Sequence, residues 1–78
     1  MIAELKPVVL EVLKRKAKIV YRDGRIYYRV TSKELIREVN ASPQVIGMVI
    51  RELERDNKIR LVEVAKRNYG TRYIFEVR

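Results

Sequence analysis

The 78-residue sequence contains neither cysteine nor histidine. Without cysteine the chain can form no disulfide, no thiolate nucleophile and no cysteine-ligated metal site. Without histidine it lacks the commonest general base and the commonest metal ligand. Its three glycines, Gly24, Gly47 and Gly70, are isolated, so no glycine-rich loop is available to cradle a phosphate. We therefore expect no enzymatic activity, no metal and no cofactor.

The sequence also lacks a long hydrophobic run. Its longest mostly apolar stretch is Val45–Ile50, whereas a membrane-spanning helix needs about 20 apolar residues. The amino terminus carries Glu4 and Lys6, and it has no extended apolar core of the kind found in signal peptides. From these features and the length we expect a single domain over residues 1–78, with no membrane partner and a cytoplasmic location.

Positive charge is what the sequence has in excess. Lysine and arginine number 18 against 10 acidic residues, which gives a net charge of +8 and a pI of about 10.1. Such an excess predicts attraction to a polyanion, which could be DNA, RNA or an anionic membrane surface. The charged fraction of 36% resembles the composition of hyperthermophile proteins and indicates a thermophilic source.

Two helices joined by a tight turn are predicted over residues 31–56. The run Thr31–Glu34 has the form of a capping box and is followed by apolar residues at helical spacing. Asn40–Ala41 would end this helix. Ser42 is suited to cap a second helix, Pro43–Asp56, because a proline in the first turn loses no hydrogen bond.

A β-hairpin is predicted over residues 59–77. Two β-rich runs, Ile59–Ala65 and Thr71–Val77, are separated by the short polar segment Lys66–Gly70. The last half of the chain would thus consist of two helices followed by a hairpin with a basic tip.

The first part of the chain is less clearly patterned. A helix is predicted from Pro7, at its first position, to about Lys18, and residues 1–6 either extend this helix or form a loose end. Asp23–Gly24 then lies between β-branched and aromatic residues, which is typical of a two-residue hairpin turn. Two interpretations stand equally: a small hairpin around this turn, or a helix that continues to Val20 with only Ile26–Val30 as a strand.

The predicted helix over residues 43–56 has two distinct faces. Ile46, Ile50 and Leu53 form a narrow apolar stripe with Val49 at its edge. The opposite face carries only a sparse set of groups able to read base edges, and we predict that this face contacts nucleic acid through Gln44, Met48, Arg51 and Arg55.

Two basic segments flank this nearly neutral helix. Residues 14–30 carry seven cations against one aspartate, and residues 66–78 carry four cations against one glutamate. We predict that both segments anchor phosphates, the first through Lys14, Lys16 and Arg25 and the second through Lys66, Arg67 and Arg72. Tyr69 in the predicted hairpin loop is a candidate for stacking on bases.

The segments Thr31–Leu35, Ala41–Ile46 and Ile50–Ile59 resemble the winged helix-turn-helix superfamily, particularly small archaeal DNA-binding regulators. The resemblance covers about residues 31–77 and implies an α+β fold of three helices, a small antiparallel sheet and a basic hairpin wing. It implies a helix-turn-helix over residues 31–56 and a wing hairpin over residues 59–77. By position, it also implies that the DNA-facing residues are Ser42, Gln44, Met48, Arg51, Arg55, Lys66, Arg67 and Arg72.

From the charge and the resemblance together we expect double-stranded DNA binding, as a small transcriptional regulator or a nucleoid-associated chromatin protein. Met48 stands where many relatives carry a polar or basic residue, which predicts modest sequence specificity. A homodimer through the first helix would suit two-fold symmetric DNA, since the apolar face of this helix extends over Leu5–Ala17.

Two other functions compete with this one. Arg51–Glu54 followed by Ile59–Val62 is similar to the core of a winged-helix ribosomal protein of the small subunit, which implies RNA binding. Winged helices also serve as protein-interaction modules, in which exposed Val45, Met48 and Val49 would form a hydrophobic docking patch.

Overall fold

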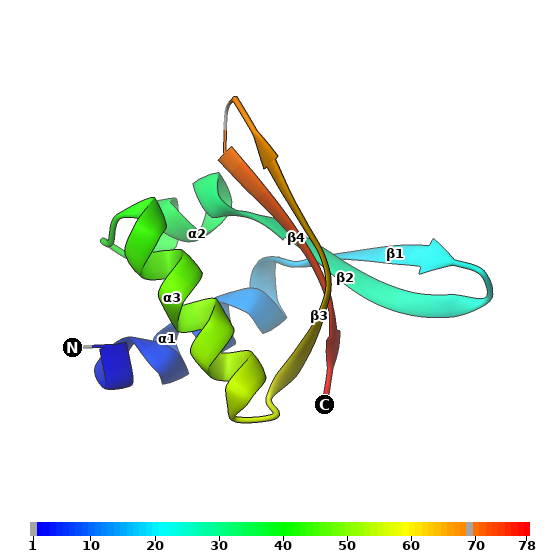
Figure 1. Cartoon of the computed structure of the whole chain (residues 1–78), viewed down its shortest axis with the longest axis horizontal. Coiled ribbons are helices and arrows are strands. Elements are labelled where there is room, and N and C mark those ends of the chain that lie inside the picture. Colours follow the sequence, from blue (N-terminus) through cyan, green and yellow to red (C-terminus); the bar gives the residue numbers. More distant parts are fainter. Residues whose placement is uncertain (1, 69) are drawn as a thin grey trace.

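The computed structural model describes residues 2–68 and 70–78, and within these residues the fold is α+β, with three helices and a four-stranded antiparallel sheet. The elements follow the chain in the order shown in Figure 1. They are α1 (Ile2–Lys16), β1 (Lys18–Arg22), β2 (Arg25–Thr31), α2 (Ser32–Glu38), α3 (Pro43–Arg55), β3 (Ile59–Arg67) and β4 (Gly70–Val77).

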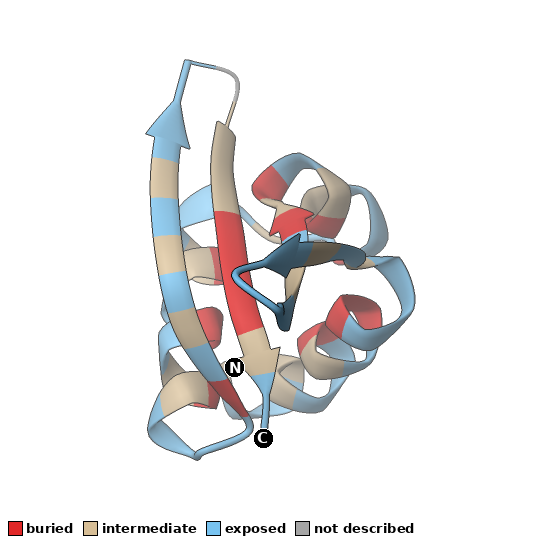
Figure 2. Ribbon diagram, turned by 90° about the vertical axis from the view of Figure 1, so that its right-hand side faces the viewer, coloured by how far each residue is buried: buried red, intermediate tan, exposed pale blue. Residues whose placement is uncertain are grey.

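The sheet has the order β1-β2-β4-β3, so the last strand of the chain lies between the second and the third. All neighbouring strands are antiparallel. The helices pack against one face of the sheet (Figure 1), and the core cluster accordingly joins helix residues to Val30, Ile59, Tyr73 and Phe75 of the strands. The buried residues lie in the middle of β4 and on the inner sides of the helices (Figure 2).

Two helices form within residues 31–56, as the sequence predicts. Thr31 and Glu34 form both hydrogen bonds of the capping box, since the Glu34 amide donates to Thr31 Oγ1 at 3.3 Å and Glu34 Oε1 accepts from the Thr31 amide at 3.0 Å. The Ser42 hydroxyl caps α3 by accepting from the Val45 amide at 3.3 Å. The predicted capping of both helices is therefore confirmed.

The apolar stripe predicted on α3 is also confirmed. Ile46, Ile50 and Leu53 are at most 2% exposed. Val49, which the sequence placed at the edge of this stripe, is fully buried. Burying such side chains contributes about 1.5–3 kcal/mol each, so this face of α3 is firmly fixed toward the core.

The amino-terminal helix differs from its predicted bounds. It begins at Ile2, five residues before Pro7, and ends at Lys16. Pro7 therefore lies inside the helix, where the backbone N–H that it lacks would have bonded to the carbonyl of Ala3. Ala3 is exposed, so water can satisfy that carbonyl, which explains why the helix tolerates the proline.

Of the two interpretations for the segment after α1, the hairpin around Asp23–Gly24 is confirmed, and the helix that continues to Val20 is not formed. β1 pairs with β2 across Asp23 and Gly24, and both turn residues have positive φ angles, 52° and 74°. Two consecutive positive φ angles match the twist of the flanking strands. The hairpin projects beyond the helices (Figure 1), which leaves the side chains of Ile19, Tyr21 and Ile26 at least half exposed.

The β3–β4 hairpin spans residues 59–77 as predicted, but its strands extend closer to the turn and it contains an irregularity. Leu61 pairs with Phe75, whereas Glu63 pairs with Ile74, so Val62 is an extra residue on β3. Such a bulge changes which residues face each side of the sheet. Beyond it, Val64 and Lys66 share the face of Tyr73 and Thr71, their partners on β4.

A hydrogen bond ties this hairpin to the start of α2. The hydroxyl of the buried Ser32 accepts from the Thr71 amide at 2.9 Å. The neighbouring Gly70 has a φ of 134°, and a Cβ at this position would stand 2.9 Å from Ser32 Oγ. Both the backbone conformation and the close approach thus require glycine here.

We expect Gly70→Ala to lower the free energy of unfolding by about 1–3 kcal/mol, because an alanine would be strained at this φ and would collide with Ser32. Gly24→Ala is the matched control: its φ is also positive, but a Cβ there meets nothing within 4 Å. It should cost less, about 1 kcal/mol. Urea unfolding followed by circular dichroism measures both. If the collision matters, Ser32→Ala should reduce the cost of Gly70→Ala; equal costs in both backgrounds would contradict it.

Candidate nucleic-acid interface

The outward face of α3 carries the residues that the sequence predicts there. Gln44, Met48, Arg51 and Arg55 are all exposed, on the side opposite the buried stripe. Ser42 is exposed as well, although its hydroxyl already accepts a hydrogen bond as the cap of α3. The structure therefore places four of the predicted contact residues on the outward face of α3, with Ser42 exposed at its start.

The acidic groups of α3 are occupied by partners within the molecule. Glu52 lies 3.1 Å from Arg55 and 3.8 Å from Lys6, and Asp56 accepts a hydrogen bond from Lys6 Nζ at 2.9 Å. The hydrogen bond to Asp56 raises the pKa of Lys6 above its ordinary value. Glu54 accepts from the Leu61 amide at 3.0 Å. Glu52 and Asp56 are thus held near α1, and Glu54 is held at the start of β3.

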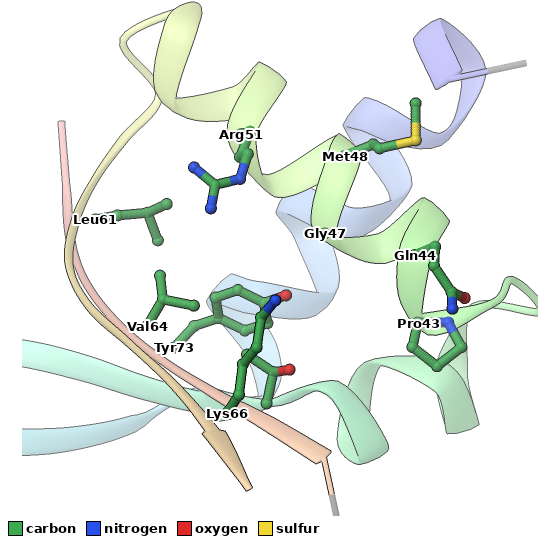
Figure 3. A pocket seen from close by; sticks show the side chains of 10 residues that line it. Pro43, Gln44, Gly47, Met48, Arg51, Leu61, Val64, Lys66 and Tyr73 are labelled. Carbon is green, nitrogen blue, oxygen red and sulfur yellow. The ribbon is translucent and has the colours of Figure 1, made fainter.

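Arg51 has a different environment from Arg55. Among the residues that the structure describes, no carboxylate lies within 4.0 Å of Arg51, whereas Arg55 is paired with Glu52. Arg51 extends from α3 toward Leu61 and Tyr73, while Met48 points away from them (Figure 3). The guanidinium of Arg51 is thus available to a ligand beside α3.

A groove of about 460 Å³ separates α3 from the β3–β4 hairpin (Figure 3). Arg51 lies on its α3 side and Lys66 on its β3 side, and Tyr73 of β4 also lines it. None of the described residues that line the groove is acidic. They are Pro43, Gln44, Gly47, Met48, Arg51, Leu61, Val64, Lys66, Thr71 and Tyr73.

Lys66 and Arg67 face opposite sides of the hairpin, as successive strand residues do. Lys66 lines the groove, whereas Arg67 joins Lys33 and Arg72 around a smaller hollow of about 90 Å³. In the described part of the chain, neither Lys66 nor Arg67 has a carboxylate within ion-pair distance. Both cations are exposed, so the hairpin offers one to each side.

Arg72 does not join Lys66 in the groove, although the sequence analysis grouped them. Its neighbours Thr71 and Tyr73 face the groove, so alternation along the strand turns Arg72 to the opposite face. There its guanidinium lies 2.9 Å from Glu63, which also pairs with Arg22 at 3.3 Å. The Arg72 Nε atom is buried and has no hydrogen-bond partner among the described residues.

The first basic segment is separated from α3. Arg25 begins β2 next to the hairpin turn, and this turn and α3 lie at opposite ends of the long axis of the molecule (Figure 1). That axis measures 38 Å. Lys14 and Lys16 lie in the last turn of α1, which leads into the same hairpin. The structure therefore does not bring these three cations to the groove. The predicted stacking residue Tyr69 lies outside the described residues.

The hydrophobic docking patch predicted for an interaction module is not formed. Val49 is fully buried and Val45 is partly buried against the core, which leaves Met48, at 51% exposed, as the single exposed member of the three. A single methionine does not make a contiguous apolar surface. The reason is that α3 turns Val49 inward together with its core stripe.

Tyr73 lines the groove although it is not among the predicted site residues. Its ring is 6% exposed and belongs to the core cluster, and its hydroxyl reaches the groove beside Gly47. The sequence signal for its position is alternation along β4, which puts Tyr73 on the same side as Phe75 and Thr71; the bulge in β3 determines only that Val64 lies opposite it. Burial raises the pKa of the Tyr73 hydroxyl, and the positive charge of Arg51 opposes part of that rise.

No described helix is long and apolar enough to cross a membrane. Within the same residues, no cluster of three or more acidic side chains is arranged to hold a metal ion. Comparisons of the chain with protein-family models, with curated proteins and with solved structures find no match. The resemblance to winged helix-turn-helix proteins therefore stays a prediction.

The ion pairs of Glu63 give a prediction about pH. Hydrogen bonds from Arg72 and Arg22 lower the pKa of Glu63 below its ordinary value of 4.5. A carboxylate whose pKa is lowered by folding stabilises the protein above its unfolded pKa, and this contribution is lost as the pH falls through the folded pKa. We expect Glu63→Gln to lower the thermal midpoint at pH 7, and the difference from wild type to shrink as the pH falls toward about 3. Melting curves across this range measure the effect; a pH-independent difference would contradict it.

Proposed function

We propose that the protein binds double-stranded DNA as a winged helix-turn-helix protein, acting as a small transcriptional regulator or a chromatin-associated protein. The observation that carries the proposal is the arrangement of charge around α3. Its carboxylates are held by Lys6, Arg55 and a backbone amide, whereas Arg51 and Lys66 face a groove with no described acidic residue. This arrangement turns a helix of slightly negative formal charge into a surface that attracts phosphate.

The order and pairing of the elements support the proposal. Helix α1 precedes the strands β1 and β2, and the helices α2 and α3 follow them. The β3–β4 hairpin then completes the sheet, with β4 next to β2. This is the order that the resemblance to winged helices implies, with β1 as an additional strand. In such an arrangement α3 would be the recognition helix and the β3–β4 hairpin the wing.

The dimensions of α3 suit the major groove of DNA. Its 13 residues give a length of about 20 Å, and the major groove, about 12 Å wide, admits an α-helix. Gln44 could donate to base edges, and Met48 could contact a thymine methyl group, whereas Arg51 is assigned to a phosphate. So short a list predicts modest sequence specificity, with affinity supplied mainly by phosphate contacts.

The test is the salt dependence of duplex binding. Fluorescence anisotropy with a labelled random-sequence duplex should show affinity that falls steeply between about 50 and 300 mM salt, because phosphate contacts release counterions. Arg51→Ala and Lys66→Ala should each weaken binding and reduce the slope of log K against log salt by about 1.

Arg60→Ala is the matched control. It removes one positive charge from the sheet face opposite α3, where Arg60 pairs with Glu76, and it should leave the slope unchanged. Equal effects of all three variants would indicate attraction by net charge alone and contradict a site at α3. Stronger competition by folded ribosomal RNA than by unlabelled duplex would favour the RNA-binding alternative, and no binding at low salt would exclude both.

A further inference from the structure

The Tyr73 hydroxyl is the least explained polar group in the groove. The residue is only 6% exposed, yet its hydroxyl reaches the groove at the wall formed by Gly47, and it is not among the buried side-chain atoms without a partner in the described residues. A tyrosine of this kind packs its ring in the core and leaves its hydroxyl free to bond with water or a ligand at the edge of the core. An uncommitted hydroxyl that reaches a groove is therefore a candidate ligand contact.

Gly47 determines whether that hydroxyl can be reached. A Cβ at this position would stand 3.5 Å from the Tyr73 oxygen, in ordinary van der Waals contact, and would cover part of it. Gly47 lies in the middle of α3, where glycine is about 1 kcal/mol less favourable than alanine. Glycine at this position thus lowers the stability of α3, and it leaves the Tyr73 hydroxyl uncovered.

The surroundings of this hydroxyl favour a small anion with an apolar neighbour. Arg51 is close enough to act on the ionisation of Tyr73, and Lys66 lies on the other side of the groove (Figure 3). Burial keeps the pKa of Tyr73 above its ordinary value of 10.0, so at neutral pH the hydroxyl retains its proton and can donate it in a hydrogen bond. Leu61 and Val64 add an apolar wall against which a sugar ring could pack.

We propose that this groove holds one phosphodiester of the DNA backbone, with the Tyr73 hydroxyl donating to a phosphate oxygen and Arg51 and Lys66 flanking it. This inference rests on the proposed function and assigns it a specific contact. The phosphate would enter between α3 and the β3–β4 hairpin and would fix the register of α3 on the duplex, as backbone contacts generally do.

Two substitutions test the contact. Tyr73→Phe removes only the hydroxyl, and it should weaken duplex binding about tenfold, the effect expected of a hydrogen bond to a charged group. Because it removes no charge, the salt slope should stay that of wild type, in contrast to Arg51→Ala. Gly47→Ala should weaken binding similarly by covering the hydroxyl, while it raises the thermal midpoint through the better helix propensity of alanine.

Tyr21→Phe is the control, since Tyr21 is 75% exposed on the β1–β2 hairpin, away from α3; it should bind like wild type. Wild-type affinity in both Tyr73→Phe and Gly47→Ala would overturn this inference and leave the proposed function standing. Failure of wild-type protein to bind any duplex would overturn both.

Inorganic phosphate serves as the second probe. Suppose that phosphate binds to the wild-type protein but not to Tyr73→Phe, while Tyr73→Phe leaves duplex affinity unchanged. The groove is then a site for free anions, and its assignment to a backbone phosphate is wrong.

Discussion

The burial of one face of α3 determines the arrangement of everything around it. Ile46, Val49, Ile50 and Leu53 enter the core shared with α1 and the sheet, and removing a side chain of this kind typically costs 2–5 kcal/mol. Because this packing fixes the rotation of α3 about its axis, it also fixes which side chains of α3 face outward. Arg51 consequently faces the groove, and Glu52 and Asp56 come within reach of Lys6 on α1. The charge pattern of the surface is thus a consequence of the packing beneath it.

Local sequence patterns predicted the parts of the fold that depend on neighbouring residues. The caps formed by Thr31 and Ser42, the stripe on α3 and the turn at Asp23–Gly24 all rest on interactions within a few positions of the chain. The start of α1 was harder to place, because proline is most familiar at the first helical turn and yet is tolerated further inside where the freed carbonyl is exposed to water.

The site depends on long-range contacts that local patterns do not encode. Lys6 and Asp56 are 50 residues apart, so the formal charge of α3 counted along the sequence misrepresents its surface. Lys66 faces the groove only because the bulge at Val62 shifts the alternation of β3 by one residue. Arg72 is a different case: alternation from the apolar Tyr73 would have placed it on the far face, so the signal for its position was present in the sequence.

Several features of α3 that reduce the stability of the isolated helix fall on its outward side. Gly47 lowers helix propensity, Met48 exposes half of an apolar side chain to water, and Arg51 and Arg55 place like charges one turn apart. The pair of Arg55 with Glu52 relieves the last of these in part. Elsewhere in α3 the cap, the proline and the buried stripe agree with the fold. Local rules are expected to be broken mainly where function requires it, and in α3 these costs fall on the outward face while the buried face obeys the rules.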